Sequence, residues 1–272
     1  MLLMGIDKRP GESGTAFRTD TLIILSIDPV THTAGILSVP RDLFVTIPPN
    51  TVVSTNYGLQ RINAAYDIGE LTKPGSGATL AMQTVQYNIG IKINAYVVVD
   101  FQSVIAIVNA VGGVDVDVAS AINDPYYPSM NFGYDPLYIP AGHIHMDGAL
   151  ALKYARSRHQ SDDLDRARRQ QQIVDAVRDK ALNVSMVAQL AAQAPSLWNT
   201  LSADIHTDLT FDQLVSLALY AKDIPKANVH QGVIDWHYVS GQVYQGMDIL
   251  VPNRAAIGPL MVQVFGANYN NG

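Results

Sequence analysis

Three apolar runs stand close together at the start of this 272-residue chain and restrict its fold more than any other feature. Leu2–Ile6 comes first, residues 21–28 follow a loop rich in glycine and serine, and residues 34–39 come after a group of turn formers. Two β-rich runs joined by turn formers predict an antiparallel hairpin. The second run is apolar almost throughout, which is typical of a central strand covered on both faces. The hairpin argues against an all-parallel sheet and favours a mixed one.

Helical and strand-like segments alternate along the rest of the chain. The spacing of apolar residues predicts helices over 78–88, 101–111, 147–155, 164–182 and 211–222, and strands over 95–100, 114–118, 228–233 and 237–243. The last two strands are expected to pair with each other, and residues 123–139 are expected to form a loop. We therefore predict an α/β fold: one three-layer α/β/α domain over residues 1–272, with a central mixed β-sheet. Its motifs lie within residues 2–182, and residues 183–272 continue the same domain.

Composition excludes several classes of site. The chain has no cysteine, so disulfides, thiolate nucleophiles and cysteine-ligated metals are excluded. A net charge of −6 argues against nucleic acid as a partner, because that role needs a broad basic surface. No run approaches the roughly 18 consecutive apolar residues of a membrane span. Since the chain opens directly on an apolar strand, we expect that an upstream segment is missing, and a membrane anchor is the natural candidate.

Five of the 18 basic residues lie within the short stretch from Arg156 to Arg169. Arginine stays charged at any working pH, and its planar fork matches phosphate oxygens, so the stretch indicates an anionic partner. A solvated helix face is the alternative. Helical spacing puts Arg166, Arg169 and Gln170 on one face, whereas Arg168 points away from both neighbours. We expect Arg166 and Gln170 in the site, keep Arg169 as a further candidate, and expect Arg168 in solvent.

Two carboxylates flank the first two apolar runs. Asp7 follows the first run and Asp20 precedes the second, so antiparallel strands would bring both to one end of the sheet. Hard oxygen ligands with no histidine or cysteine nearby suit Mg²⁺ or Mn²⁺; ordinary turn residues are the alternative. Arg41 ends the third run after Pro40. It either enters a site from there or pairs on the surface with Asp42.

The order of these motifs resembles the LytR–CpsA–Psr family of bacterial cell-envelope glycopolymer transferases. Along the chain they read Gly-Ile-Asp-Lys-Arg, Arg-Thr-Asp-Thr, Val-Pro-Arg-Asp, Arg-Ile-Asn-Ala-Ala-Tyr, and Arg-Ser-Arg with Asp-Leu-Asp-Arg-Ala-Arg-Arg-Gln-Gln. They span residues 2–172, and the resemblance over residues 183–272 is loose. The family implies an extracytoplasmic α/β/α domain on the outer face of a bacterial cell membrane, normally tethered by an N-terminal transmembrane helix.

The resemblance also implies a Mg²⁺-dependent phosphotransferase. A glycosyl phosphate of a wall, teichoic-acid-like or capsular polymer would pass from a polyprenyl-pyrophosphate carrier to a sugar hydroxyl of peptidoglycan. Asp7 and Asp20 would hold the metal, and Arg41 would be the most critical cation on the pyrophosphate. The other residues implied to bind the pyrophosphate are Arg61, Arg156, Arg158, Asp163, Arg166 and Gln170. The general base stays open, because a metal-bound carboxylate is a poor base.

Two departures from the family pattern make substrate preference harder to predict than reaction type. Arg61 stands where the family usually has lysine, which keeps the charge but not the shape. The loop after Arg158 is short, and His159 has no counterpart.

Two other functions remain open: a polyprenyl-pyrophosphate hydrolase with water as acceptor, and a non-catalytic polyprenyl-lipid-binding module. Apolar residues at helical spacing could line a lipid tunnel, but they are equally typical of a filled core. The tyrosine-rich stretch of residues 126–138 would rim a glycan site or serve only as a covering loop.

Overall fold

A computed structural model gives the fold and describes residues 1–8, 12–49, 54–130, 133–157, 163–181, 196, 198 and 204–270. The chain divides into two compact units. The first contains Met1–Asp7, Ser13–Val98 and Thr207–Gly272, and the second contains Lys8–Glu12 and Val99–His206. Whether the two units form one domain, as predicted, stays a prediction.

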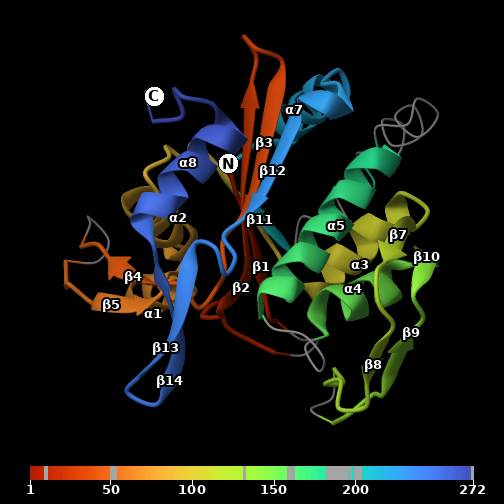
Figure 1. Cartoon of the computed structure of the whole chain (residues 1–272), viewed down its shortest axis with the longest axis horizontal. Helices are drawn as coiled ribbons and strands as arrows, with labels where there is room; N and C mark the ends of the chain where they lie inside the picture. Colours follow the sequence, from red (N-terminus) through yellow and green to blue (C-terminus); the bar gives the residue numbers. More distant parts are fainter. Residues whose placement is uncertain are drawn as a thin grey trace. The chain divides into compact units, whose positions relative to one another are not determined.

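A six-stranded sheet, in the order β11-β6-β1-β2-β3-β12, lies mostly within the first unit (Figure 1). Its strands are β1 (Leu2–Ile6), β2 (Thr19–Asp28), β3 (Thr33–Ser38), β6 (Tyr96–Val99), β11 (Ile205–Thr207) and β12 (Val229–Val233). The pairs β1–β2 and β2–β3 are antiparallel, whereas β12 pairs with β3 in parallel. The predicted α/β class with a central mixed sheet is therefore confirmed, and the three apolar runs are its first three strands.

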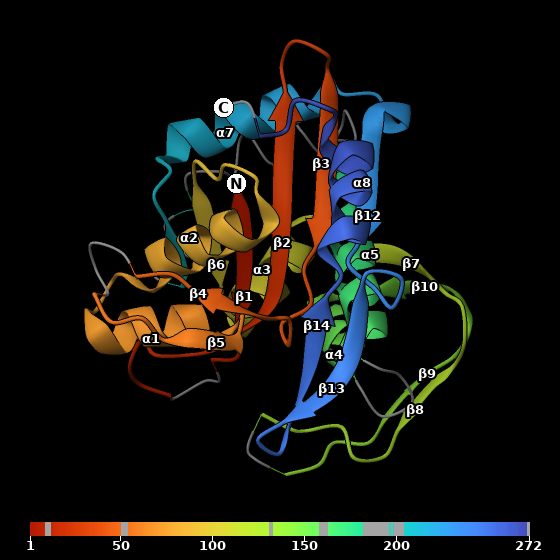
Figure 2. The ribbon, with the colours of Figure 1, turned by 60° about the vertical axis from the view of Figure 1, so that its left-hand side comes forward.

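The hairpin of β2 and β3 lies between β1 and β12 (Figure 2). Leu22, Ile23 and Ile24 of β2 are consecutive and all buried. Successive side chains of a strand point to opposite faces, so both faces of β2 are covered. This confirms the central strand that its nearly unbroken apolar run predicts.

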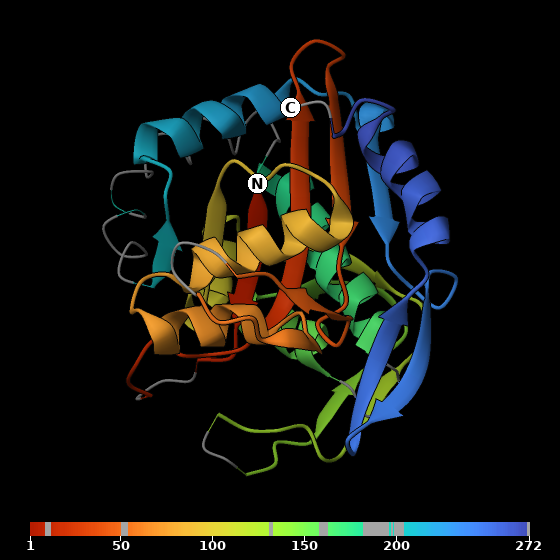
Figure 3. The ribbon, with the colours of Figure 1, turned by 90° about the vertical axis from the view of Figure 1, so that its left-hand side faces the viewer.

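Helices α1 (Ala64–Thr72), α2 (Gly77–Ile89) and α8 (Arg254–Phe265) lie on one side of this sheet (Figures 1 and 3). The first two pack closely because their contact is made of glycines: a Cβ on Gly69 would lie 2.7 Å from the Cα of Gly77. The carboxylate of Glu70 accepts the N–H groups of Gly75 and Gly77, each at 2.9 Å, and so fixes the turn between the helices. Helix α7 (Phe211–Lys222) has the predicted bounds.

Two hairpins complete the first unit: β4 (Phe44–Ile47) with β5 (Gly58–Arg61), and β13 (Val239–Tyr244) with β14 (Met247–Pro252). The predicted pairing of residues 228–233 with residues 237–243 is wrong, since β12 pairs with β3 and β13 pairs with β14. The turn after β13 explains the difference. Gln245 and Gly246 both have positive φ, 51° and 78°, and two such residues close a tight hairpin.

Over residues 99–130, 133–157 and 163–181, the described part of the second unit has three helices and two strand pairs. Its elements are α3 (Phe101–Ala110), β7 (Val114–Val118), β8 (Ile122–Asp124), β9 (Leu137–Ile139), β10 (Gly142–Met146), α4 (Gly148–Arg156) and α5 (Asp163–Ala181). Strands β7 and β10 pair antiparallel, and so do β8 and β9. The expectation that residues 123–139 form only a loop is wrong. Leu137 and Ile139 are buried on either side of the exposed Tyr138, the alternation of a half-buried strand.

Capping aspartates set the starts of two helices in the second unit. Asp100 accepts the N–H of Ser103 at 2.9 Å before α3, and Asp147 accepts the N–H of Leu150 at 2.8 Å before α4. Within the described residues, no helix combines the length and apolar character needed to cross a bilayer.

Candidate functional site

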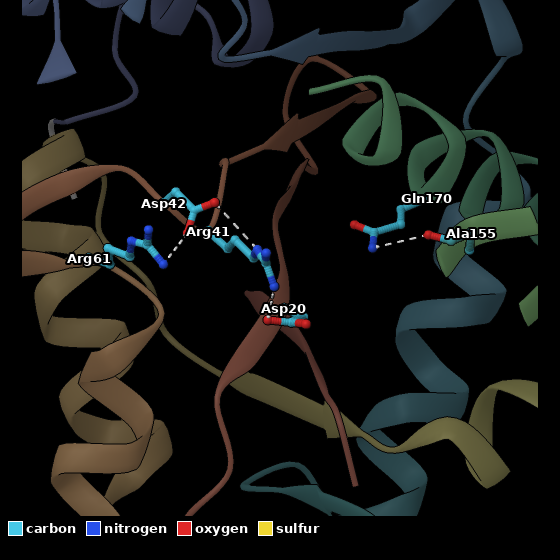
Figure 4. A network of polar contacts seen from close by, with 6 residues as sticks. All are labelled: Asp20, Arg41, Asp42, Arg61, Ala155 and Gln170. Carbon is cyan, nitrogen blue, oxygen red and sulfur yellow. Dashed lines mark hydrogen bonds and ion pairs between the residues drawn. The ribbon is translucent and has the colours of Figure 1, made fainter. Parts of the chain in front are cut away.

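Four alternating charges in the first unit join into a chain of ion pairs around Arg41, which lies in the turn after β3. Its Nη1 donates to Oδ1 of Asp20 at 2.8 Å, and its Nε lies 3.5 Å from Oδ2 of Asp42. Nη1 of Arg61 lies 3.3 Å from the other oxygen of Asp42. Figure 4 shows these side chains pointing toward one another. We call Asp20, Arg41, Asp42 and Arg61 the Arg41 cluster.

The Arg41 cluster is half-buried: its four side chains are between 16% and 23% exposed. Partial burial strengthens Coulomb attraction relative to an exposed pair, so the guanidinium of Arg41 is held in one orientation. For Arg41 the sequence left two possibilities, entry into a site or an ion pair with Asp42. The structure contains the ion pair with Asp42, and Arg41 also bonds Asp20. The sequence analysis did not predict that Asp42 bridges two arginines. Its position next to Arg41 in Val-Pro-Arg-Asp was the signal that could have indicated this role.

A β-bulge sets the position of Asp20. The ladder pairs Gly5 with Thr21 and Ile6 with Thr19, so Asp20 is the extra residue on β2. A bulge locally redirects a side chain out of the regular ladder. Asp7 directly follows Ile6, so both carboxylates stand at the same end of the β1–β2 pair, as antiparallel strands predict.

These donors fit a hard divalent cation that takes few protein ligands. Among the residues that the structure describes, no group of three or more His, Cys, Asp or Glu side chains could hold a metal. Mg²⁺ needs only one or two carboxylates, because waters and substrate phosphates supply its other ligands. Asp7 and Asp20 match that requirement in number and chemistry, and Arg41 engages one of the two carboxylate oxygens of Asp20. The metal itself stays a prediction.

Arg61 ends β5 and is also tied to the neighbouring hairpin. Its Nη2 donates to the backbone carbonyl of Asp248 in β14. Helix α1 begins three residues later, at Ala64. Arg61 therefore links the Arg41 cluster to two hairpins, which gives it a structural role beside any contact with substrate.

In the second unit, Arg156 ends α4 against two aromatic rings. Its guanidinium carbon lies 4.0 Å from the ring centroid of Phe101, and its Nη1 donates to the hydroxyl of Tyr127 at 3.2 Å. A cation over an aromatic face gains electrostatic energy and loses side-chain freedom. Burial raises the pKa of Tyr127 above its usual value, so this hydroxyl stays protonated at neutral pH. The side chain of Arg156 is thus held in place before any ligand arrives.

Helix α5 binds the end of α4 through two side chains. Arg169 donates from Nε to the carbonyl of Tyr154 at 3.1 Å and from Nη2 to the carbonyl of Ser157. Gln170 donates to the carbonyl of Ala155 at 3.5 Å (Figure 4). The last carbonyls of a helix lack partners within it, so Arg169 and Gln170 stabilise this end of α4.

The remaining arginines of α5 differ in exposure. Arg166 is buried. Arg168 is 47% exposed and pairs with Asp165 at 3.0 Å, which confirms its predicted place in solvent. Arg158 and His159 lie outside the described residues. Asp163 is the first residue of α5, but its side chain is outside what the structure describes.

Replacing Tyr127 by phenylalanine tests whether the orientation of Arg156 matters. The ring that contacts Arg156 stays, while the hydroxyl that accepts its N–H is lost. We expect unfolding free energy to fall by about 1 kcal/mol, the usual net value of one hydrogen bond. If Arg156 contacts substrate, we also expect three- to tenfold slower turnover, on the order of one oriented contact. Unfolding in urea and steady-state turnover measure the two effects; unchanged turnover would mean that this bond is only structural.

The model of the LytR_cpsA_psr family matches residues 1–261. The chain therefore belongs to the LytR–CpsA–Psr family, as its motif order predicts. The match includes most of residues 183–272, where the resemblance in sequence is loose.

Two curated relatives are named as transferases. A polyisoprenyl-teichoic acid–peptidoglycan teichoic acid transferase, TagU of Oceanobacillus iheyensis, is 35% identical over 219 residues, which cover 80% of this chain and 61% of TagU. TagV of Bacillus subtilis, named for the same transfer, is 34% identical over 70% of this chain and 45% of its own length. The chain thus spans about half to three fifths of these relatives.

A solved structure supports the fold over nearly the whole chain. The crystal structure of Bacillus subtilis TagV is similar with a TM-score of 0.75 and 26% identity, and the match covers 99% of this chain and 96% of that one. The fold, including the segments that follow residue 204, is therefore that of known members of the family.

Proposed function

We propose that this protein transfers the glycosyl phosphate of a cell-wall glycopolymer from a polyprenyl-pyrophosphate carrier to a sugar hydroxyl of peptidoglycan. Family membership and the names of its relatives support this class of reaction. The observation that carries the proposal to this chain is Arg41, whose guanidinium is held by Asp20 and Asp42 within the family motif Val-Pro-Arg-Asp. The reaction would occur at the outer face of a bacterial cell membrane, where a lipid carrier presents its head group.

The transfer is a displacement at phosphorus. The acceptor hydroxyl oxygen forms a bond to the phosphorus that carries the sugar, and the bridging P–O bond breaks. The leaving polyprenyl phosphate keeps the bonding electron pair, while the hydroxyl proton passes to a general base. Such reactions need positioning and positive charge at the phosphate oxygens more than covalent help from the protein.

Charge balance in the Arg41 cluster favours a role for a metal. In the ion pairs of the described residues, Arg41 and Arg61 face Asp20 and Asp42, two positive charges against two negative ones. A pyrophosphate diester brings two further negative charges, so its binding there calls for additional positive charge. Mg²⁺, or Mn²⁺, held by Asp7 and Asp20 would supply that charge at the pyrophosphate oxygens.

The resemblance to the family implies that basic residues outside the Arg41 cluster also bind the pyrophosphate, and that role stays a proposal. Arg156 and Arg166 would bind pyrophosphate oxygens as charge-assisted donors. Arg158, Asp163 and Gln170 are assigned to the pyrophosphate because they match the family motif. Gln170 would act mainly by holding the end of α4, which carries Arg156, since its amide binds the carbonyl of Ala155.

Identifying the products tests the reaction class. Purified protein is mixed with Mg²⁺, a lipid-linked glycopolymer labelled in its glycan, and peptidoglycan oligomers. We expect the label to join the oligomers with release of one polyprenyl phosphate per transfer, and we expect chelation of the metal to stop it. Label found only in free glycosyl phosphate would make the protein a hydrolase. No turnover with any metal, together with unchanged lipid binding by Arg41→Ala, would leave a non-catalytic lipid-binding module.

A further inference from the structure

Strands β8 and β9 form an arm of the second unit (Figure 1), and its exposed residues have an unusual composition. Tyr126, Tyr134 and Tyr138 are 60%, 71% and 67% exposed. The other exposed residues of the arm, within residues 122–130 and 133–140, are Asn123, Gly133 and four prolines. Large aromatic rings gathered on one exposed face commonly mark a binding surface.

The opposite face of the arm is fixed to α4. Ser157 donates to the buried carboxylate of Asp124 at 2.8 Å, and Lys153 pairs with Asp135 at 2.5 Å. Tyr127, also buried, accepts the N–H of Arg156. Three polar links and the packing of Leu137 and Ile139 in the core therefore hold the backbone that carries the exposed tyrosines. A surface held in this way loses little conformational entropy when it binds a ligand.

The exposed tyrosines are themselves partly ordered. The rings of Tyr126 and Tyr134 meet edge to face, with centroids 5.6 Å apart and planes at 74°. Such a pair is a favoured aromatic geometry and keeps one ring face directed outward. Tyr138 lies opposite Asn123 in the β8–β9 ladder, so a ring face and an amide stand side by side farther along the arm.

We infer that this outward face binds a neutral carbohydrate chain, the glycan strand of the acceptor. The inference rests on the proposed function, because it supplies the second substrate of that reaction. In the described part of the arm the one exposed charged side chain is that of Asp135, which is 47% exposed and paired with Lys153, and none of the exposed residues is Leu, Ile, Val, Met or Phe. Flat rings with hydroxyl and amide groups match sugar rings, whose faces are apolar and whose edges carry hydroxyls. Protein interfaces are also rich in tyrosine, but they add arginine and methionine anchors, and neither is among the exposed residues in the described part of the arm.

The spacing of the tyrosines indicates a chain of sugars instead of a single one. Tyr134 and Tyr138 are four residues apart on one extended segment, which places them up to about 13 Å from each other. That span exceeds a single sugar ring. We therefore expect affinity to rise with the number of linked sugars.

Binding of water-soluble N-acetylglucosamine oligomers, from dimer to hexamer, tests this inference without lipid carrier or metal. Titration calorimetry with the whole protein is expected to give tighter binding for longer oligomers. The double variant Tyr134→Ala/Tyr138→Ala should weaken hexamer binding by about tenfold or more, since one aromatic contact contributes roughly three- to tenfold. Tyr138→Phe keeps the ring face and should stay within about threefold of the natural protein, the effect of one hydroxyl.

Tyr87→Ala serves as the matched control, because Tyr87 is 62% exposed on α2 and lies outside the arm. Arg41→Ala separates the inference from the proposed function, since it should slow transfer by about 100-fold but keep oligomer binding. Thermal unfolding should be unchanged in Tyr138→Phe and Tyr87→Ala, whereas loss of the Tyr126–Tyr134 ring contact should lower the Tm of the double variant by only a few degrees. Equal hexamer binding by the natural protein and the double variant, or no hexamer binding at all, would overturn the inference and leave this face to another class of partner, such as a protein.

Discussion

Arg41→Ala should lower the rate of glycopolymer transfer by about 100-fold, the upper range for a charge-assisted contact formed in the transition state. Arg41 is held by Asp20 at 2.8 Å and by Asp42 at 3.5 Å, so its guanidinium is oriented before substrate binds. The leaving phosphate gains negative charge as the P–O bond breaks, and a preorganised cation stabilises that charge without further cost. Transfer of labelled glycan to peptidoglycan oligomers measures the loss.

Two further variants make the result interpretable. Arg41→Lys keeps a positive charge beside Asp20 and Asp42 but loses the planar fork, so we expect an intermediate rate. Arg168→Ala removes an exposed arginine paired with Asp165, and its rate should stay within about twofold because exposed pairs contribute little. Circular dichroism and Tm check that Arg41→Ala is folded. A folded Arg41→Ala protein with a near-normal rate would remove Arg41 from the mechanism.

Local sequence signals predicted the elements whose residues interact with near neighbours. The bounds of β1, β7 and α7 match because their apolar spacing is regular and their partners or caps are close in sequence. The pairing of β12 was mispredicted because its partner β3 lies almost 200 residues earlier and no local pattern encodes it. The arm of β8 and β9 was missed because prolines and tyrosines conceal two strands of only three residues each.

The same distinction holds for the candidate site: residues with a signal in the sequence were predicted, and contacts that depend on packing were not. Motif order along the chain singled out Asp20, Arg41 and Arg61. In the structure Asp20 pairs directly with Arg41, and Asp42 links Arg41 to Arg61. The capping of α4 by Arg169 and Gln170 could not be read from the sequence. It depends on how α5 packs against α4, which helical spacing within α5 alone does not define. Helical spacing correctly predicted that Arg168 is exposed to solvent, because the face of a helix on which a residue lies depends only on its position in that helix.

Gly148→Ala should lower the free energy of unfolding by about 3 kcal/mol or more, at the upper end of overpacking effects, because backbone atoms leave no room for a methyl group. Gly148 is the first residue of α4, and a Cβ there would lie 2.2 Å from the carbonyl oxygen of Ile105 in α3. Its N–H also donates to the side chain of Asn109 at 2.8 Å. Accommodating the methyl group must move α4 away from α3, and Arg156 ends the displaced helix. We therefore expect slower transfer as well as lower stability.

Gly241→Ala is the matched control for this effect. Gly241 lies in the exposed part of β13, where a Cβ would make only ordinary contacts with Trp236 at 3.5 Å. Alanine restricts the unfolded chain more than glycine, so this variant should be neutral or more stable by about 0.5–1 kcal/mol. Urea unfolding followed by circular dichroism compares the two variants under one condition. Equal stability of Gly148→Ala and Gly241→Ala would mean that α3 and α4 separate easily, and the close approach at Gly148 would then not hold Arg156 in position.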